Sequence, residues 1–283
     1  MDSRILARLR CPVCAEPLTE ATAGTTRALR CPRGHSFDTA RQGYVNLLAG
    51  RSPHTGDSAE MVAARADFLA AGHYDAVAAA LATTAVRVAG VDPYPLVVDA
   101  GAGTGHYLAA VLATLPEAAG LALDVSKPAL RRAARAHPRA AAALADTWQR
   151  LPLADRSVAV LLNVFAPRNG PEFHRVLDPG GALLVVTPAA DHLTELVDAL
   201  DLLRVDPDKA DRVAGSLGAH FAEESATGHR ARLALTRAEV TTLVGMGPSA
   251  WHAEPERLAA RVAALPEPVP VTLSVRLGVH RPR

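Results

Sequence analysis

The stretch Val97–Tyr107 limits the possible folds of this chain more than any other part of its sequence, V-V-D-A-G-A-G-T-G-H-Y. An apolar run ends at Asp99, a loop with Gly101, Gly103 and Gly105 follows, and a segment able to form a helix comes next. This order is typical of sites where the polar end of a ligand meets bare backbone N–H groups at a helix N-terminus. The glycines allow the tight turn and the close approach of the ligand.

The rest of the chain after residue 95 alternates between short apolar runs and helical segments. We expect parallel strands at 96–98, 120–124, 141–145, 158–163 and 182–187, separated by helices at 107–114, 127–136 and 171–177 and by a turn at 178–181. Helices are also expected at 59–71, 75–88, 191–204 and 207–220, and late antiparallel strands at 230–236 and 271–279. This alternation predicts an α/β fold with a doubly wound, mostly parallel Rossmann-like sheet.

All three cysteines lie within the first 31 residues. Cys11 and Cys14 form a C-x-x-C pair, and Cys31 and His35 form a C-x-x-x-H pair 16 residues later. This spacing suits one tetrahedral zinc ion, and four protein ligands make the site structural rather than catalytic. Three buried thiols with an incidental histidine are the alternative, and a redox role is disfavoured because no thioredoxin-like pattern surrounds the pair.

Charge and composition suggest how the chain is organised. The 283 residues carry a formal net charge of +1, but residues 1–51 hold eight arginines against four acids. A polar linker follows, so we expect a basic zinc-binding module at 1–50, linker helices at 51–90 and the α/β domain at 91–283. No apolar signal core or membrane-length run is present, which predicts a soluble, cytoplasmic protein without a membrane partner.

The ligand of the glycine loop is indicated by acids that follow successive strands. The loop lacks the G-x-G-x-x-G spacing of dinucleotide sites and the lysine of nucleoside triphosphate sites. Asp124 ends the second strand, where an acid can hold ribose hydroxyls, and Asp146 follows the third, where an acid can accept from an adenine amino group. Asp99 could order the loop or engage a ligand ammonium through water. Together these residues favour S-adenosylmethionine (SAM), although each acid alone could be an ordinary strand-end residue.

Several motifs in fixed order resemble one family across essentially the whole chain. These are C-P-V-C…C-P-R-G-H-S-F-D, G-D-S-A-E-M-V, G-H-Y, D-A-G-A-G-T-G, L-D-V-S-K-P-A, N-V-F-A-P-R, P-G-G and D-H-L. The chain resembles the RlmA family of SAM-dependent 23S ribosomal RNA (guanine-N1)-methyltransferases. It looks most like the branch that confers resistance to tylosin-type macrolides in antibiotic-producing bacteria.

The resemblance implies functions for particular residues. It implies that Cys11, Cys14, Cys31 and His35 bind zinc. It also implies that Tyr74, the loop residues Gly103 and Thr104, and His192 contact SAM. The substrate would be 23S rRNA, the zinc-binding module at 1–50 would be an RNA-recognition module, and the protein would pair as a homodimer.

A guanine pocket is expected after the fourth strand, where Asn163 could read the base edge and Phe165 could stack on the base, with Pro167 and Arg168 beside them. Phe165 could equally belong to the core. RNA could also contact a basic cluster at helical spacing that consists of Lys127, Arg131, Arg132, Arg135 and Arg139. The alternative is that these side chains form an ordinary solvated helix face. Two other functions remain open, a small-molecule methyltransferase of antibiotic biosynthesis and a catalytically idle RNA-binding protein. The zinc module argues against the first, and the intact glycine loop with its acids against the second.

Overall fold

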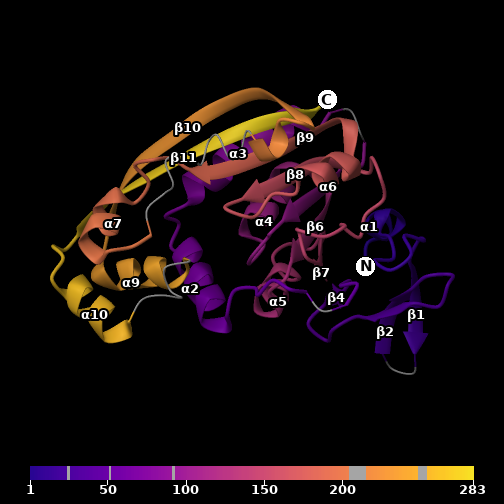
Figure 1. The fold of residues 1–283 in the computed structure, drawn as a ribbon, viewed down its shortest axis with the longest axis horizontal. Helices are drawn as coiled ribbons and strands as arrows, with labels where there is room; N and C mark the ends of the chain where they lie inside the picture. The colour runs from indigo at the N-terminus through magenta and orange to yellow at the C-terminus, as the bar shows by residue number, and fades with distance from the viewer. Residues whose placement is uncertain (24–25, 51, 91–92, 204–214, 248–253) are drawn as a thin grey trace.

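The computed structural model describes residues 1–23, 26–50, 52–90, 93–203, 215–247 and 254–283. Its main feature is one eight-stranded sheet in the order β10-β11-β9-β8-β5-β6-β7-β4 (Figure 1). The strands are β4 (Tyr44–Asn46), β5 (Leu96–Ala100), β6 (Ala119–Asp124), β7 (Ala140–Leu144), β8 (Val158–Val164), β9 (Leu177–Pro188), β10 (Phe221–Leu235) and β11 (Val269–Pro282). The six strands from β4 to β9 pair in parallel. β10 and β11 add antiparallel pairs. The predicted doubly wound, mostly parallel sheet is confirmed.

Helices cover both faces of this sheet because its central strands are apolar on both sides. Val97 and Leu162 face one hydrophobic core, and Val98 and Leu161 face the other. The first core is covered by α2 (Ala59–Ala70), α3 (Asp75–Val88), α4 (His106–Thr114), α5 (Lys127–Ala133), α7 (Thr194–Leu200), α9 (Arg237–Gly245) and α10 (Pro255–Ala263). The second is covered by α1 (Ser3–Arg8), α6 (Gly170–Val176) and the N-terminal module. Continuous burial along β5 and β8 is what a parallel sheet covered on both faces requires.

The N-terminal module is built into this sheet rather than attached beside it. Its own antiparallel sheet contains β1 (Thr19–Ala23), β2 (Thr26–Arg30) and β3 (Ser36–Asp38). Its next strand, β4, instead pairs in parallel with β7, from Tyr44 opposite Ala142 to Asn46 opposite Leu144. Ile5 and Leu9 are fully buried in the second core. The expected boundary at residue 50 therefore separates segments of sequence, while the sheet and the core extend across it.

Most predicted elements occur within a few residues of their expected bounds. The turn expected at 178–181 is instead the irregular start of β9, and Gly181 is needed there because a Cβ would lie 2.8 Å from the carbonyl oxygen of Ala159. Most of the helix expected at 207–220 falls outside the described residues. Among the described residues, every helix is too short or too polar to span a lipid bilayer.

Candidate zinc centre and SAM site

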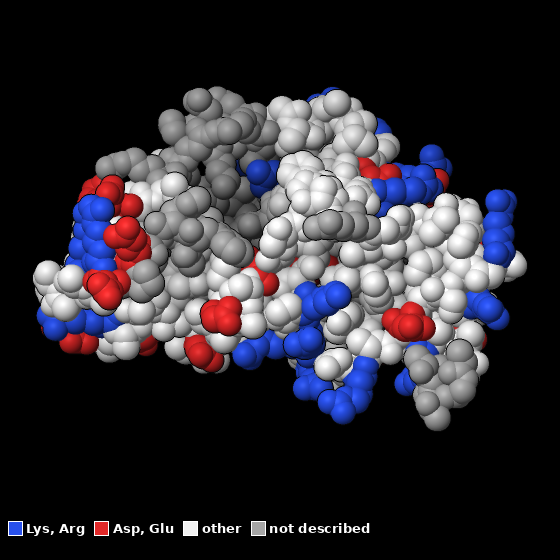
Figure 2. Space-filling model, turned by 60° about the horizontal axis from the view of Figure 1, so that its bottom comes forward, with Lys and Arg blue, Asp and Glu red and all other residues white. Residues whose placement is uncertain are grey.

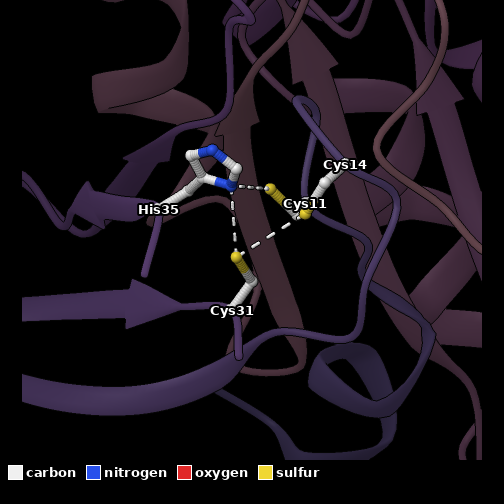
Figure 3. A group of neighbouring side chains, drawn as sticks. All are labelled: Cys11, Cys14, Cys31 and His35. Carbon is white, nitrogen blue, oxygen red and sulfur yellow. Dashed lines mark hydrogen bonds between the residues drawn. The ribbon is translucent and has the colours of Figure 1, made fainter. Parts of the chain in front are cut away.

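Two tight turns bring the four predicted metal ligands together (Figure 3). Cys11 and Cys14 lie in the turn after α1, and Cys31 and His35 lie between β2 and β3. Sγ of Cys14 lies 3.7 Å from Sγ of Cys31, and Nδ1 of His35 lies 3.5 Å from Sγ of Cys11 and 3.3 Å from Sγ of Cys31. Tetrahedral bonds of about 2.3 Å to sulfur and about 2.0 Å to nitrogen would separate the ligand atoms by roughly 3.5–3.8 Å. The four side chains therefore fit a structural zinc ion.

The glycine loop is shaped by contacts with the protein and offers few free N–H groups. The N–H groups of Gly101 and Ala102 both donate to the carbonyl oxygen of Leu123, and that of Gly105 donates to Ala102. Gly103 donates to Oδ2 of Asp124 at 2.8 Å. Only Thr104 keeps an N–H without a partner in the described part of the loop. The adjacent strand thus uses most N–H groups of the loop itself, and the bare N–H groups expected at the N-terminus of the following helix remain a prediction.

The same glycines are required by backbone conformation and by packing. Gly101, Gly103 and Gly105 all have positive φ angles, of 84°, 54° and 80°. A Cβ on Gly101 would lie well under 3.0 Å from Cβ of Ala166, and one on Gly105 would lie 3.0 Å from Cα of Ala133. Ala166 belongs to the loop after β8, so the segment that carries Phe165 rests directly on the glycine loop.

Asp99 lies next to the last residue of β5, just before the glycine loop, and is almost completely buried. Neither of its carboxyl oxygens has a hydrogen-bond partner among the described residues. Burial, followed by the nearby charge of Asp124, raises the pKa of Asp99 to about 8. An unpartnered buried carboxyl group is costly unless a ligand satisfies it. A ligand with a cationic group suits this position, and SAM carries both an ammonium and a sulfonium.

We therefore expect SAM affinity to depend on pH through Asp99. In the free protein the carboxyl group is protonated below about pH 8. A bound cation favours the carboxylate, so binding releases a proton and affinity rises with pH up to about pH 8, by at most tenfold per unit. Calorimetry at pH 7 in buffers of different ionisation enthalpy should show close to one proton released for the wild type and none from this site for Asp99→Asn. The amino group of SAM contributes equally to proton release in both proteins, so the difference between them reports Asp99. Equal proton release in the two proteins would contradict the assignment.

Asp124 and Asp146 lie at the ends of neighbouring strands, as expected, but both are already engaged. Asp124 accepts the N–H groups of Gly103 and Ser126, each at 2.8 Å. Oδ2 of Asp146 accepts Ser52 Oγ at 2.9 Å and lies 2.8 Å from Nδ1 of His54. A ribose or adenine group would therefore share these oxygens or replace a linker side chain.

The linker crosses the edge of the sheet where these acids lie. The Ser126 hydroxyl donates to the carbonyl oxygen of Asp57 at 2.8 Å, and a Cβ on Gly56 would lie 2.6 Å from the backbone N of Ser126. Arg65 on α2 pairs with Asp57 and donates to the carbonyl oxygen of Met246 at 2.8 Å. Its Nη1 would lie 3.4 Å from a Cβ on Gly103. The polar stretch before α2 is the only signal in the sequence for the contacts of this linker and of Arg65.

Three aromatic rings gather at the carboxyl edge of β5 and β8. His192 and Phe165 are stacked with centroids 6.1 Å apart, and Tyr74 lies 6.1 Å from Phe165. The Ser274 N–H donates to Nδ1 of His192, so a neutral imidazole carries its proton on Nε2, which lies 3.4 Å from the Tyr74 hydroxyl oxygen. The hydroxyl hydrogen of Tyr74 then has no acceptor among the described residues. The structure thus brings together Tyr74 and His192, two of the residues predicted to contact SAM.

Phe165 differs from the rings around it in exposure and backbone. It is 41% exposed, whereas Tyr74 is buried, and its φ of 52° lies in the left-handed region. A bulky residue in this conformation is strained, and such strain is common where a side chain must be presented to a ligand. The alternative of a core role for Phe165 is therefore wrong.

Asn163 and Arg139 are placed differently from expectation. Asn163 is fully buried, and its amide nitrogen donates to the carbonyl oxygens of Ala100 at 3.2 Å and Pro167 at 2.7 Å. It positions the loop after β8 and does not present its NH₂ group to a base. Arg139 donates to the carbonyl oxygen of Leu115 at 2.6 Å and to those of Leu112 and Ala118. It caps the C-terminal end of α4, so it is not available to RNA.

Comparison with known proteins agrees with this arrangement. Residues 9–52 match the zinc-ribbon family described as RlmA, N-terminal, and residues 97–181 match a methyltransferase domain family. A Micromonospora griseorubida protein with the provisional name 23S rRNA (guanine-N(1)-)-methyltransferase is 68% identical over 294 residues, covering all of both chains. The 23S rRNA (guanine(748)-N(1))-methyltransferase of Streptomyces fradiae is 53% identical over 282 residues, covering 100% of this chain and 99% of the relative. The chain belongs to the RlmA family of SAM-dependent 23S rRNA (guanine-N1)-methyltransferases.

Proposed function

We propose that this protein transfers a methyl group from SAM to N1 of a guanine in 23S rRNA, at the position equivalent to guanine 748, and so protects the ribosome from a macrolide-type antibiotic. The proposal rests on full-length identity of 53% to the Streptomyces fradiae enzyme of that name. The observation that carries the chemistry is the unpartnered carboxyl group of Asp99 at the start of the glycine loop, a loop that packs against Ala166, the residue after the exposed Phe165. A methyltransferase that acts on a small molecule would have no evident use for the zinc module. A catalytically idle protein would have no evident use for a buried carboxyl group, on Asp99, that lacks a hydrogen-bond partner.

In this mechanism the chain mainly binds and orients its two substrates. SAM supplies a methyl group on a positively charged sulfur. Guanine N1 loses its proton to solvent and attacks the methyl carbon in line with the breaking C–S bond, whose electron pair stays on sulfur. Phe165 stacks on the target base after it leaves its own stack, while Asp99 and Tyr74 hold the polar end of SAM. Burial raises the pKa of Tyr74, so its hydroxyl stays neutral and can donate.

The basic surface over α5 supports an RNA substrate. Lys127, Arg131, Arg132 and Arg135 are exposed, and none of the four has an ion-pair partner in the described part of the chain. Lys and Arg side chains gather over this helix (Figure 2). Phosphate contacts by unpaired cations supply most of the sequence-independent affinity for nucleic acid. The homodimer implied by the family resemblance is part of the same proposal and can be tested by sedimentation.

The test is transfer of label from SAM to unmethylated 23S RNA, followed by nuclease mapping. We expect the label at N1 of the guanine equivalent to 748. Phe165→Ala should lower the single-turnover rate by about 10- to 100-fold, because base stacking on an aromatic ring contributes about 1–3 kcal/mol, and SAM affinity should change little. Val86→Ala removes an exposed apolar side chain on α3 and serves as the control. Label found only in small molecules, or no transfer at all, would reject the proposal.

A further inference from the structure

An exposed indole ring lies at the carboxyl edge of the sheet, and the mechanism above does not use it. Trp148 follows β7 and is 52% exposed. Two other large aromatic side chains are exposed in the described part of the chain, those of Phe165 and Tyr94. Phe165 is assigned to the target base, and Tyr94 precedes β5 at the opposite edge, where the guanidinium of Arg4 lies 5.9 Å from its ring centroid. The Trp148 ring is therefore open to solvent on the side of the molecule where SAM and the target base are expected.

The loop that carries Trp148 is held on both sides of the ring. The amide nitrogen of Asn169 donates to the carbonyl oxygens of Thr147 at 3.0 Å and Gln149 at 3.3 Å. The N–H of Trp148 donates to Oδ1 of the buried Asp146 at 3.0 Å. The ring is thus presented to solvent from a fixed backbone. An aromatic ring held in this way loses little freedom when a ligand stacks on it, which favours binding.

A second ring is anchored on the same carboxylate. Nδ1 of His54 lies 2.8 Å from Oδ2 of Asp146, and the His54 ring centroid lies 6.0 Å from that of Trp148. Burial acts to raise the pKa of Asp146, but its hydrogen bonds outweigh this effect and lower the pKa. Asp146 is therefore an acceptor, so Nδ1 of His54 carries a proton and donates it. Nε2 of this half-exposed side chain has no partner in the described part of the chain.

The position of the two rings favours an RNA base as their ligand. Strands β7 and β8 are separated by β5 and β6, so three strand spacings put the loops of Trp148 and Phe165 about 14 Å apart. On its other side the Trp148 loop leads to Pro152, whose carbonyl oxygen accepts the N–H of Arg10 next to the zinc ligand Cys11. Trp148 thus lies between the zinc module and the predicted guanine pocket, and unpaired bases of RNA loops stack on aromatic rings of this kind.

We propose that Trp148 and His54 form a second nucleobase site, in which an unpaired base near the target guanine stacks on the indole and bonds through its edge to Nε2 of His54. This inference rests on the proposed function and adds a site for a second nucleotide to it. The buried carboxylate of Asp146 holds both side chains in place before RNA arrives. A base bound there would fix the RNA loop relative to Phe165 while the target guanine leaves its own stack.

The test measures retention of unmethylated, in vitro transcribed 23S RNA on filters together with its methylation. Trp148→Ala should weaken RNA retention and raise KM for RNA by about tenfold, because one stacking contact is lost. Its kcat at saturating RNA and its SAM affinity without RNA should not change. Trp148→Phe keeps an aromatic ring and should stay within about threefold of the wild type. Tyr94→Ala removes an equally exposed ring at the opposite edge and should match the wild type.

Tryptophan fluorescence reports the stacking directly. The chain has two tryptophans, so the difference in emission between the wild type and Trp148→Phe reports the Trp148 ring. We expect a transcript of the region around the target guanine to quench this difference, and SAM alone to leave it unchanged. His54→Asn keeps a donor for Asp146 and lacks Nε2. It should weaken RNA retention by about threefold, as expected for one modest hydrogen bond, and keep the quenching.

Three results would overturn the second base site. Wild-type RNA retention by Trp148→Ala would mean that no base stacks on the ring. Quenching by SAM alone, with weaker SAM binding by Trp148→Ala, would assign the ring to the adenine of the cofactor. An equal loss in Tyr94→Ala would mean a general effect of removing a surface ring. If the wild type bound RNA with quenching but transferred no methyl group, the proposed function would be wrong and the base site would stand. Normal methylation without quenching would reject the base site alone.

Discussion

Cys31→Ser should abolish zinc binding and reduce RNA methylation by at least about 100-fold, while SAM binding persists below the melting temperature. Loss of a structural zinc site costs several kcal/mol or more, because the ligands hold turns that do not form otherwise. The loss would also loosen β4, which pairs with β7, and the buried side chains of Ile5 and Leu9. We therefore expect a melting temperature lower by roughly 10 °C. Metal analysis, thermal melting and methylation assays check the three parts separately.

Val13→Ser is the matched control, because Val13 lies between Cys11 and Cys14 and is 56% exposed. It changes the surface of the same turn without removing a ligand, so zinc content and melting temperature should stay unchanged. A Cys31→Ser protein that contains no zinc and still methylates RNA at the normal rate would contradict the structural role of the site. Substitution is a sharper test than deletion of residues 1–50, since deletion would also remove β4 from the sheet.

The parts of the fold predicted from sequence are those determined by local patterns. Apolar runs such as Val158–Val164 indicate buried strands, and the Ser58 side chain caps α2 by accepting the N–H of Met61 at 3.2 Å. The zinc ligands were predictable because metal geometry fixes their spacing along the chain. Asp99, Asp124 and Asp146 lie at one edge of the sheet because the carboxyl ends of parallel strands meet there.

The features that could not be predicted from sequence depended on contacts between distant segments. The pairing of β4 with β7 joins residues nearly 100 positions apart, and no local pattern signals it. Arg139 matches the helical spacing of its neighbours, yet it caps α4 because the α4 carbonyl oxygens lie beside it in the fold. Asn163 is drawn into the protein by two backbone carbonyl oxygens. Polar side chains with several possible acceptors cannot be placed until the fold is known.

The linker is the most informative of these unpredicted contacts. Ser52 and His54 contact Asp146, and Asp57 accepts from Ser126 and pairs with Arg65. The segment that leaves the zinc module through β4 thus crosses the edge where SAM is expected before it enters α2. The RNA contacts predicted for the module and the SAM contacts predicted at this edge would therefore be connected by one short segment. The two substrates need not act as independent ligands.

Gly101→Ala should weaken SAM binding by about 100-fold or more. Two costs combine at this position. An alanine in the left-handed region is disfavoured by roughly 1 kcal/mol, and the new Cβ would overlap Cβ of Ala166. Relief of that overlap requires the loop after β8 to move, and the loop carries Phe165. The glycine loop and Phe165 should therefore be displaced together, which calorimetry with SAM and single-turnover methylation can measure.

Gly90→Ala separates the conformational cost from the steric one. Gly90 has a φ of 72°, close to the 84° of Gly101, but a Cβ there would meet no atom within 4 Å. Its replacement should lower the free energy of unfolding by about 1 kcal/mol and leave SAM affinity unchanged. If Gly101→Ala behaved in the same way, the contact with Ala166 would not hold the loop in its binding shape. A large difference between the two variants would show that packing against the loop after β8, as well as glycine's conformational freedom, maintains the SAM site.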